Sequence, residues 1–86
     1  MAERFSLEIV TPENGSTHLD CDYISAMLVD GEAGFLKGHA PFLGALPAGI
    51  VKVTKDGVTT KYQIDDAFLK VSDSGAELFT GHCEEV

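Results

Sequence analysis

Apolar and polar residues alternate with a period of two along much of the chain. Residues 5–9, 23–29 and 58–64 each alternate in this way, and the runs are rich in β-branched and aromatic side chains. A period of two brings every second side chain to one face of a strand, and such residues suit a half-buried pleated surface. No stretch shows the apolar stripe of an amphipathic helix. The pattern therefore predicts strands with one buried face and no helix.

Turn-forming residues separate these runs at intervals of about 8–12 residues. Asn14-Gly15 follows the first run, Asp56-Gly57 divides residues 50–54 from 58–64, and Ser74-Gly75 precedes the last run. Asn-Gly and Asp-Gly suit tight hairpin turns because both residues tolerate positive φ. We therefore predict an all-β fold: an antiparallel β-sandwich or flattened barrel of about 8–10 short strands, formed by a single domain over residues 1–86.

Two sheets packed face to face pool their inward side chains into one core. The apolar residues on the expected inward faces form the predicted core: Phe5, Leu7, Ile9, Leu28, Leu46, Val51, Val53, Ile64, Leu69, Val71 and Leu78.

Composition and charge exclude several classes of protein. The chain has 86 residues and a formal net charge of −8. An acidic surface disfavours binding to nucleic acid and to an anionic membrane surface, and no apolar run approaches the ~20 residues of a membrane span. The first residues lack the pattern of a signal peptide, which favours the cytoplasm. The acid excess is explained either by solubility or by a basic protein partner.

The two cysteines, Cys21 and Cys83, are fewer than a disulfide-stapled secreted domain of this size contains. We expect both to be buried thiols that pack as small hydrophobes. A Cys21–Cys83 bridge or a reactive thiol stays open as an alternative. Neither cysteine lies in a metal-binding spacing, so no metal or cofactor is expected.

Candidate catalytic groups do not form a convincing constellation. The histidines are His18, His39 and His82. Strand alternation would turn His82 and Cys83 to opposite faces, and Asp65-Asp66 reads as a turn between two strands. We therefore expect no catalytic residue and no enzyme activity of the chain itself.

A lysine beside a hairpin turn raises an alternative function. Biotinyl and lipoyl carrier domains are all-β domains with a modified lysine on an exposed hairpin, and Lys55 precedes the predicted turn at Asp56-Gly57. Its neighbours do not match either carrier pattern, because Thr54 precedes the lysine and an aspartate follows it. A carrier domain modified at Lys55 is kept as the alternative interpretation.

The segment from residue 31 to residue 49 has more glycine and proline than a plain series of hairpins requires. Gly31 and Gly34 predict a tight turn with Glu32 at its tip. A second loop is predicted at residues 38–41, where Pro41 makes the residue before it extended. Loops specified this closely often carry function.

This segment resembles the epsilon subunit of the F-type ATP synthase. The family pattern is Gly-Glu-x-Gly, two apolar residues, Pro-Gly-His-Ala-Pro and two further apolar residues. The matching positions are Gly31-Glu32-Ala33-Gly34, Phe35-Leu36, Gly38-His39-Ala40-Pro41 and Phe42-Leu43, and similarity extends to the first and last strands. The chain departs from the family at Lys37, which replaces a proline, at Gly44, and at Asp65-Asp66, which replace two glycines.

The resemblance implies a non-catalytic rotor subunit that joins gamma to the membrane c-ring and couples proton translocation to ATP synthesis. It implies peripheral attachment at the cytoplasmic face of a bacterial membrane, without insertion. Family members usually continue into two inhibitory C-terminal helices, so this chain is expected to support coupling without helix-mediated inhibition. The resemblance assigns Gly31, Glu32 and Gly34 to the c-ring side, and Gly38, His39, Ala40, Pro41 and Phe42 to the gamma side.

Overall fold

The computed structural model describes residues 4–36 and 41–86. These residues form strands and no helix, which confirms the all-β prediction. The strands are β1 (Phe5–Thr11), β2 (Gly15–Cys21), β3 (Tyr23–Leu28), β4 (Gly31–Phe35), β5 (Phe42–Leu46), β6 (Gly49–Lys55), β7 (Val58–Ile64), β8 (Ala67–Ser72), β9 (Gly75–Thr80) and β10 (Cys83–Glu85).

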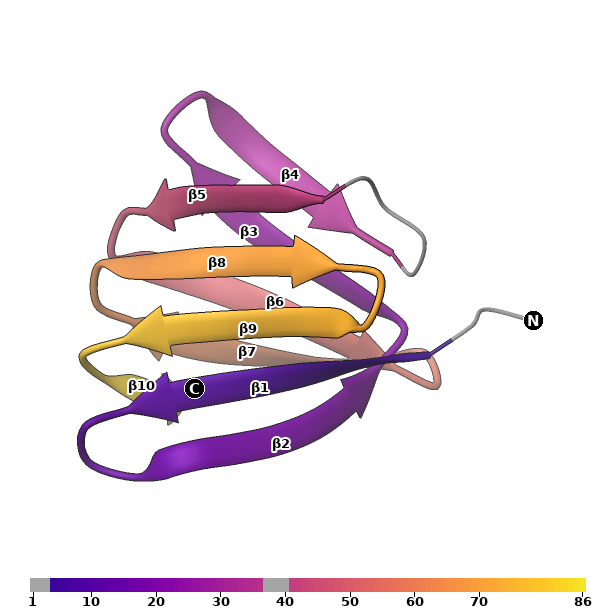
Figure 1. Cartoon of the computed structure of the whole chain (residues 1–86), viewed down its shortest axis with the longest axis horizontal. Helices are drawn as coiled ribbons and strands as arrows, with labels where there is room; N and C mark the ends of the chain where they lie inside the picture. The colour runs from indigo at the N-terminus through magenta and orange to yellow at the C-terminus, as the bar shows by residue number, and fades with distance from the viewer. Residues whose placement is uncertain (1–3, 37–40) are drawn as a thin grey trace.

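The strands form two separate five-stranded sheets, stacked one behind the other (Figure 1). The first sheet has the order β2-β1-β9-β8-β5, and the second has the order β10-β7-β6-β3-β4. The sandwich prediction is therefore confirmed. The flattened-barrel alternative is wrong, because the two sheets do not join into a closed cylinder.

One strand pair of the described residues departs from the antiparallel prediction. β1 and β9 run parallel, with Leu7 opposite Ala76 and Val10 opposite Phe79. β1 uses one edge for its hairpin with β2, so its other edge is open to a strand from the far end of the chain. The sequence alternation is the same for parallel and antiparallel partners, and it did not distinguish them.

The core lies between the inner faces of the two sheets. Every predicted core residue is buried except Leu28, which is only partly buried. Leu28 ends β3 beside an exposed turn, where the opposite sheet covers it less completely. The buried apolar residues that the prediction left out are Cys21, Ile24, Ala26, Phe35, Ala67 and Ala76.

The turn between β6 and β7 has the backbone that its sequence predicts. Asp56 and Gly57 have φ angles of 53° and 79°, as a type I′ hairpin turn requires. The Asp56 amide donates a hydrogen bond to Asp22 Oδ2 at 2.8 Å, and Arg4 forms ion pairs with both Asp22 and Asp56. The residue before β1 is thereby tied to a hairpin of the second sheet.

The Asp65-Asp66 segment is the turn that the sequence predicted. It joins β7 to β8, and Asp66 Oδ1 accepts a hydrogen bond from the Ala48 amide at 3.0 Å. The Thr80 hydroxyl donates to the Asp65 carbonyl at 3.2 Å. These aspartates therefore hold neighbouring chain segments together at one end of the sandwich.

Both cysteines are free thiols, so the disulfide alternative is wrong. Cys21 is fully buried, and its burial raises its pKa to about 11. Cys83 is only partly buried, and burial raises the pKa of its thiol as well. A thiol with a raised pKa is a poor nucleophile at neutral pH, which favours a packing role for both.

Candidate interaction surfaces

The hairpin formed by β3 and β4 contains the predicted c-ring-facing residues. Its turn lies at Val29-Asp30, and Gly31 begins β4 with a φ of 131°. The sequence predicted Glu32 at the tip of a turn, and this prediction is wrong. It is the second residue of β4, directly opposite Met27 on β3. The turn lies earlier because Gly31 supplies its positive φ at the last turn position.

Glu32 nevertheless lies on an exposed surface, the outer face of the second sheet. The Ser25 hydroxyl donates a hydrogen bond to Glu32 Oε2 at 2.6 Å. Lys52 Nζ lies 3.9 Å from the same oxygen. These three side chains come from the adjacent strands β3, β4 and β6, so a cross-strand cluster holds the carboxylate.

Gly34 has a packing reason to be glycine. A Cβ atom at this position would lie 2.0 Å from the hydroxyl oxygen of Tyr23 and 2.6 Å from its ring carbon Cζ. The Tyr23 ring therefore lies over the Gly34 backbone from the neighbouring strand. This contact explains the second glycine of the Gly-Glu-x-Gly pattern without requiring a turn there.

The predicted gamma-facing residues are only partly described. Gly38, His39 and Ala40 lie outside the described residues, and Pro41 is exposed. Phe42 begins β5, and its ring packs against Phe35 with the ring centroids 5.1 Å apart. Phe42 is therefore partly buried and packs against the core.

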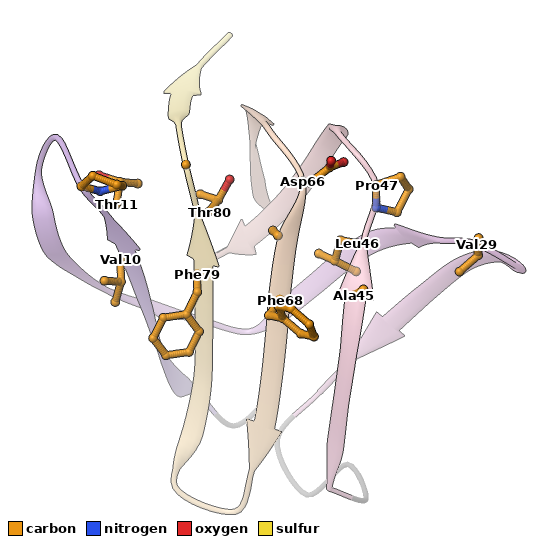
Figure 2. Close-up of a pocket in the computed structure, with 13 residues that line it drawn as sticks. Val10, Thr11, Val29, Ala45, Leu46, Pro47, Asp66, Phe68, Phe79 and Thr80 are labelled. Atoms are coloured by element: carbon orange, nitrogen blue, oxygen red, sulfur yellow. The ribbon is translucent and has the colours of Figure 1, made fainter.

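The outer face of the first sheet carries an apolar groove that the sequence analysis missed. Val10, Phe79, Phe68 and Ala45 occupy matching positions on the adjacent strands β1, β9, β8 and β5. Figure 2 shows the two phenylalanines side by side, with Val10 and Ala45 beyond them. We call these four residues the apolar strip.

The apolar strip forms the floor of a groove of about 850 Å³. Phe68 is 57% exposed and Phe79 is 43% exposed. Pro12 and Pro47 lie at one end of the groove, together with Asp66 and Gly81. The predicted core contained the adjacent leucines, Leu69 and Leu78, and left both phenylalanines unassigned. The available signal was the run of two apolar residues at Phe68-Leu69 and Leu78-Phe79.

Two further candidate groups of the described residues are His82 and Lys55. His82 Nδ1 lies 2.8 Å from Glu13 Oε1, and this hydrogen bond is the main cause of the raised pKa of His82. Lys55 is exposed at the end of β6. Within residues 4–36 and 41–86, no group of three or more histidine, cysteine, aspartate or glutamate residues could hold a metal ion. The same residues contain no helix of the length and apolarity that a membrane span needs.

Known proteins resemble this chain over nearly its full length. A family model described as "ATP synthase, Delta/Epsilon chain, beta-sandwich domain" matches residues 4–86. An ATP synthase epsilon chain from Carboxydothermus hydrogenoformans is 39% identical over 71 residues, which are 83% of this chain and 53% of the relative. The epsilon chain of a Roseiflexus species is 45% identical over 65 residues, 76% of this chain and 47% of that relative. This chain thus spans about half the length of these curated relatives.

Solved structures show the same fold. A chain in the mitochondrial ATP synthase of Euglena gracilis, in a structure of OSCP, F1 and the c-ring, superposes with a TM-score of 0.86 at 23% identity. The match covers 95% of this chain and 53% of that chain. A chain in the central stalk and c-ring structure of the Tetrahymena thermophila enzyme gives a TM-score of 0.80 at 15% identity, covering 96% and 67%.

Proposed function

Because this chain belongs to the family of ATP synthase delta/epsilon beta-sandwich domains, we propose that it is a non-catalytic rotor subunit of an F-type ATP synthase. It joins the gamma subunit to the membrane c-ring and couples proton translocation to ATP synthesis. The observation that carries this proposal is the family match over residues 4–86. Its fold is also shared with chains in central-stalk and c-ring structures of other enzymes.

The architecture suits a part that transmits force. Its two sheets are joined by a continuous apolar core, and hydrogen-bonded ladders connect neighbouring strands along their length. Close-packed interiors have low compressibility and transmit strain. A sandwich of this kind can therefore transmit torque between two partners with little deformation of its own.

The c-ring surface of our proposal is the β3–β4 hairpin with Gly31, Glu32 and Gly34. Glu32 is exposed and lies on the outer face of the second sheet. A carboxylate at such a position attracts basic groups on a polar loop, and salt weakens the attraction.

The gamma surface of our proposal includes residues 38–42 and continues into the apolar groove. β5 begins at Phe42 and contributes Ala45 and Leu46 to the groove, so the two regions adjoin along one strand. We assign the groove to gamma because β5 begins at the gamma-side residue Phe42 and also lines the groove. The apolar character of the groove suits an interface that persists. With both partners bound, the subunit lies peripherally at the cytoplasmic face of a bacterial membrane, without inserting into it.

A pull-down with purified gamma and c-ring tests the proposed function. The wild-type chain should retain both partners, and Glu32→Lys should weaken c-ring retention while leaving gamma retention unchanged. Asp73→Lys makes the same charge change in the exposed β8–β9 turn and serves as the matched control. Failure to retain either partner would overturn the proposal.

Intact-mass measurement of the chain from its native cells tests the alternative function. A biotinyl or lipoyl adduct on Lys55 would identify a carrier domain, and an unmodified mass supports the rotor subunit.

A further inference from the structure

We propose that Ser25 is the positioning residue of the c-ring contact, and that Ser25, Glu32 and Lys52 form a preorganised site for one cationic side chain of the partner. We call these three residues the Glu32 patch. This inference rests on the proposed function, and it names the partner chemistry and a residue that the family resemblance did not assign.

The sheet register brings the Glu32 patch together. Ser25 lies opposite Gly34 on one side and opposite Lys52 on the other, while Glu32 lies opposite Met27. Glu32 and Ser25 are therefore diagonal neighbours on one face of the sheet, within reach of a long side chain. Gly34 has no side chain to separate them, so the Glu32 carboxylate can reach the Ser25 hydroxyl.

Burial makes Ser25 a fixed donor. Its side chain lies on the outer face of the sheet, yet the residue is only 6% exposed. The Glu32 side chain is 55% exposed. A buried hydroxyl that donates at 2.6 Å holds the carboxylate against the sheet and removes rotational freedom before a partner arrives. Preorganisation of this kind improves affinity because less ordering remains to be done on binding.

The two oxygens of the Glu32 carboxylate have different surroundings. Both contacts found among the described residues, from Ser25 and from Lys52, are made to Oε2. The Lys52 contact is long, at 3.9 Å, and both its partners are about half exposed, so solvent screens it strongly. The Glu32 carboxylate is therefore only weakly paired with Lys52, and Oε1 is the atom we assign to a lysine or arginine of the partner.

Lys52 limits what the patch accepts. Its ammonium group lies beside the carboxylate, so a second cation at the patch would meet like charge. The Glu32 patch therefore fits a polar loop that presents one basic side chain, rather than a surface with several clustered basic side chains.

The first sheet supplies a matched control for this arrangement. The Ser16 hydroxyl also donates a hydrogen bond to a glutamate across a strand pair, in this case Glu8. Ser16 is exposed, however, and lies on the edge strand β2. The first sheet thus has a serine–glutamate hydrogen bond of the same kind, but its serine is exposed and the pair lies outside the proposed c-ring surface.

Binding of the purified full chain to detergent-solubilised c-ring, measured at low and high salt, tests the inference. Ser25→Ala should weaken binding about two- to tenfold, the range expected for one lost hydrogen bond. Ser25→Thr should restore it, since threonine keeps the donor, and Ser16→Ala should bind like the wild type. Glu32→Gln should weaken binding further and flatten its salt dependence. The effects of Ser25→Ala and Glu32→Gln should not add, because Ser25 acts on the partner only through the Glu32 carboxylate.

The outcomes separate this inference from the proposed function. If Ser25→Ala binds like the wild type while Glu32→Gln binds weakly, the positioning role is overturned and the c-ring surface stands. If Ser25→Thr binds as weakly as Ser25→Ala in a folded protein, the effect is steric and the role is also overturned. If Glu32→Gln has no effect, the assignment of this face to the c-ring fails, whereas gamma retention still tests the rotor function. Should Ser25→Ala not fold, Ser25→Cys keeps a similar shape with a weak donor and is expected to bind as weakly.

Discussion

The outer faces of the two sheets differ although their inner faces are alike. Both sheets place alternate apolar side chains into one core. On the outside, the first sheet carries the apolar strip, whereas the second carries the Glu32 patch together with the exposed residues Lys61 and Gln63. Core formation requires only one apolar face per sheet. The contents of the outer faces are therefore not needed to form the core, and the contrast between them is the basis of the two partner surfaces that we propose.

The largest expected effect is a difference in stability loss between substitutions on the two faces of β8. Leu69→Ala should lower the free energy of unfolding by about 2–5 kcal/mol, because Leu69 is fully buried on the inner face of β8. Phe68→Ala, one residue away on the outer face, should cost less than about 1 kcal/mol. Urea denaturation of both variants checks this difference. Equal losses would mean that the apolar strip belongs to the core.

A double substitution in the apolar strip should separate binding from stability. Phe68→Ser combined with Phe79→Ser should weaken gamma binding about 10- to 100-fold, since buried aromatic anchors dominate interface energies. The melting temperature should change little, and c-ring binding should be retained. Binding to gamma in the absence of the c-ring is the measurement. Unchanged affinity would remove the groove from the gamma surface.

On the second sheet, Gly34→Ala tests the contact that covers the hairpin. The new Cβ would displace the Tyr23 ring, and we expect a loss of about 1 kcal/mol in the free energy of unfolding. In a Tyr23→Ala background the same change should stabilise by up to about 1 kcal/mol, because alanine restricts the unfolded chain more than glycine does. Denaturation of the four proteins in this cycle gives both values. A loss of the same size in both backgrounds would show that the ring is not the cause.

The smallest expected effect concerns the contact between His82 and Glu13. The hydrogen bond to Glu13 raises the pKa of His82 above its ordinary value, and Glu84 and Asp65 add to the effect. The contact should therefore stabilise the fold fully below about pH 6.5. Its contribution should be lost as the pH rises through the folded-state pKa of His82. NMR titration of the ring protons in the wild type and in Glu13→Gln checks this, and the variant should show the lower pKa.

Much of the fold could be predicted because it depends on local signals. Alternation located the strands, and Asp56-Gly57 located a hairpin whose φ angles the structure reproduces. The β1–β9 pairing could not be found in this way, because it joins segments from opposite ends of the chain. Leu28 was misplaced because alternation indicates which face a side chain shares, and not how far the opposite sheet extends over it.

The candidate surfaces were predicted less completely. Glu32 was identified, but its position in a strand depends on how Gly31 ends the turn. The role of Ser25 depends on its neighbours across two strands, and a serine in the middle of a strand carries no sign of them. The apolar strip had a signal in the sequence, the adjacent apolar residues Phe68-Leu69 and Leu78-Phe79. Alternation puts the two members of each pair on opposite faces, but it does not indicate whether a partner covers the outer one.

The parallel pairing of β1 with β9 has a consequence for synthesis on the ribosome. β1 leaves the exit tunnel well before residues 76–79, which complete its hydrogen bonding. Until then the nascent first sheet presents an unpaired edge, of the kind that promotes association with other chains. The first sheet can therefore close only after residues 76–79 have been synthesised, and a chain that stalls before that point would keep β1 open to the wrong neighbour.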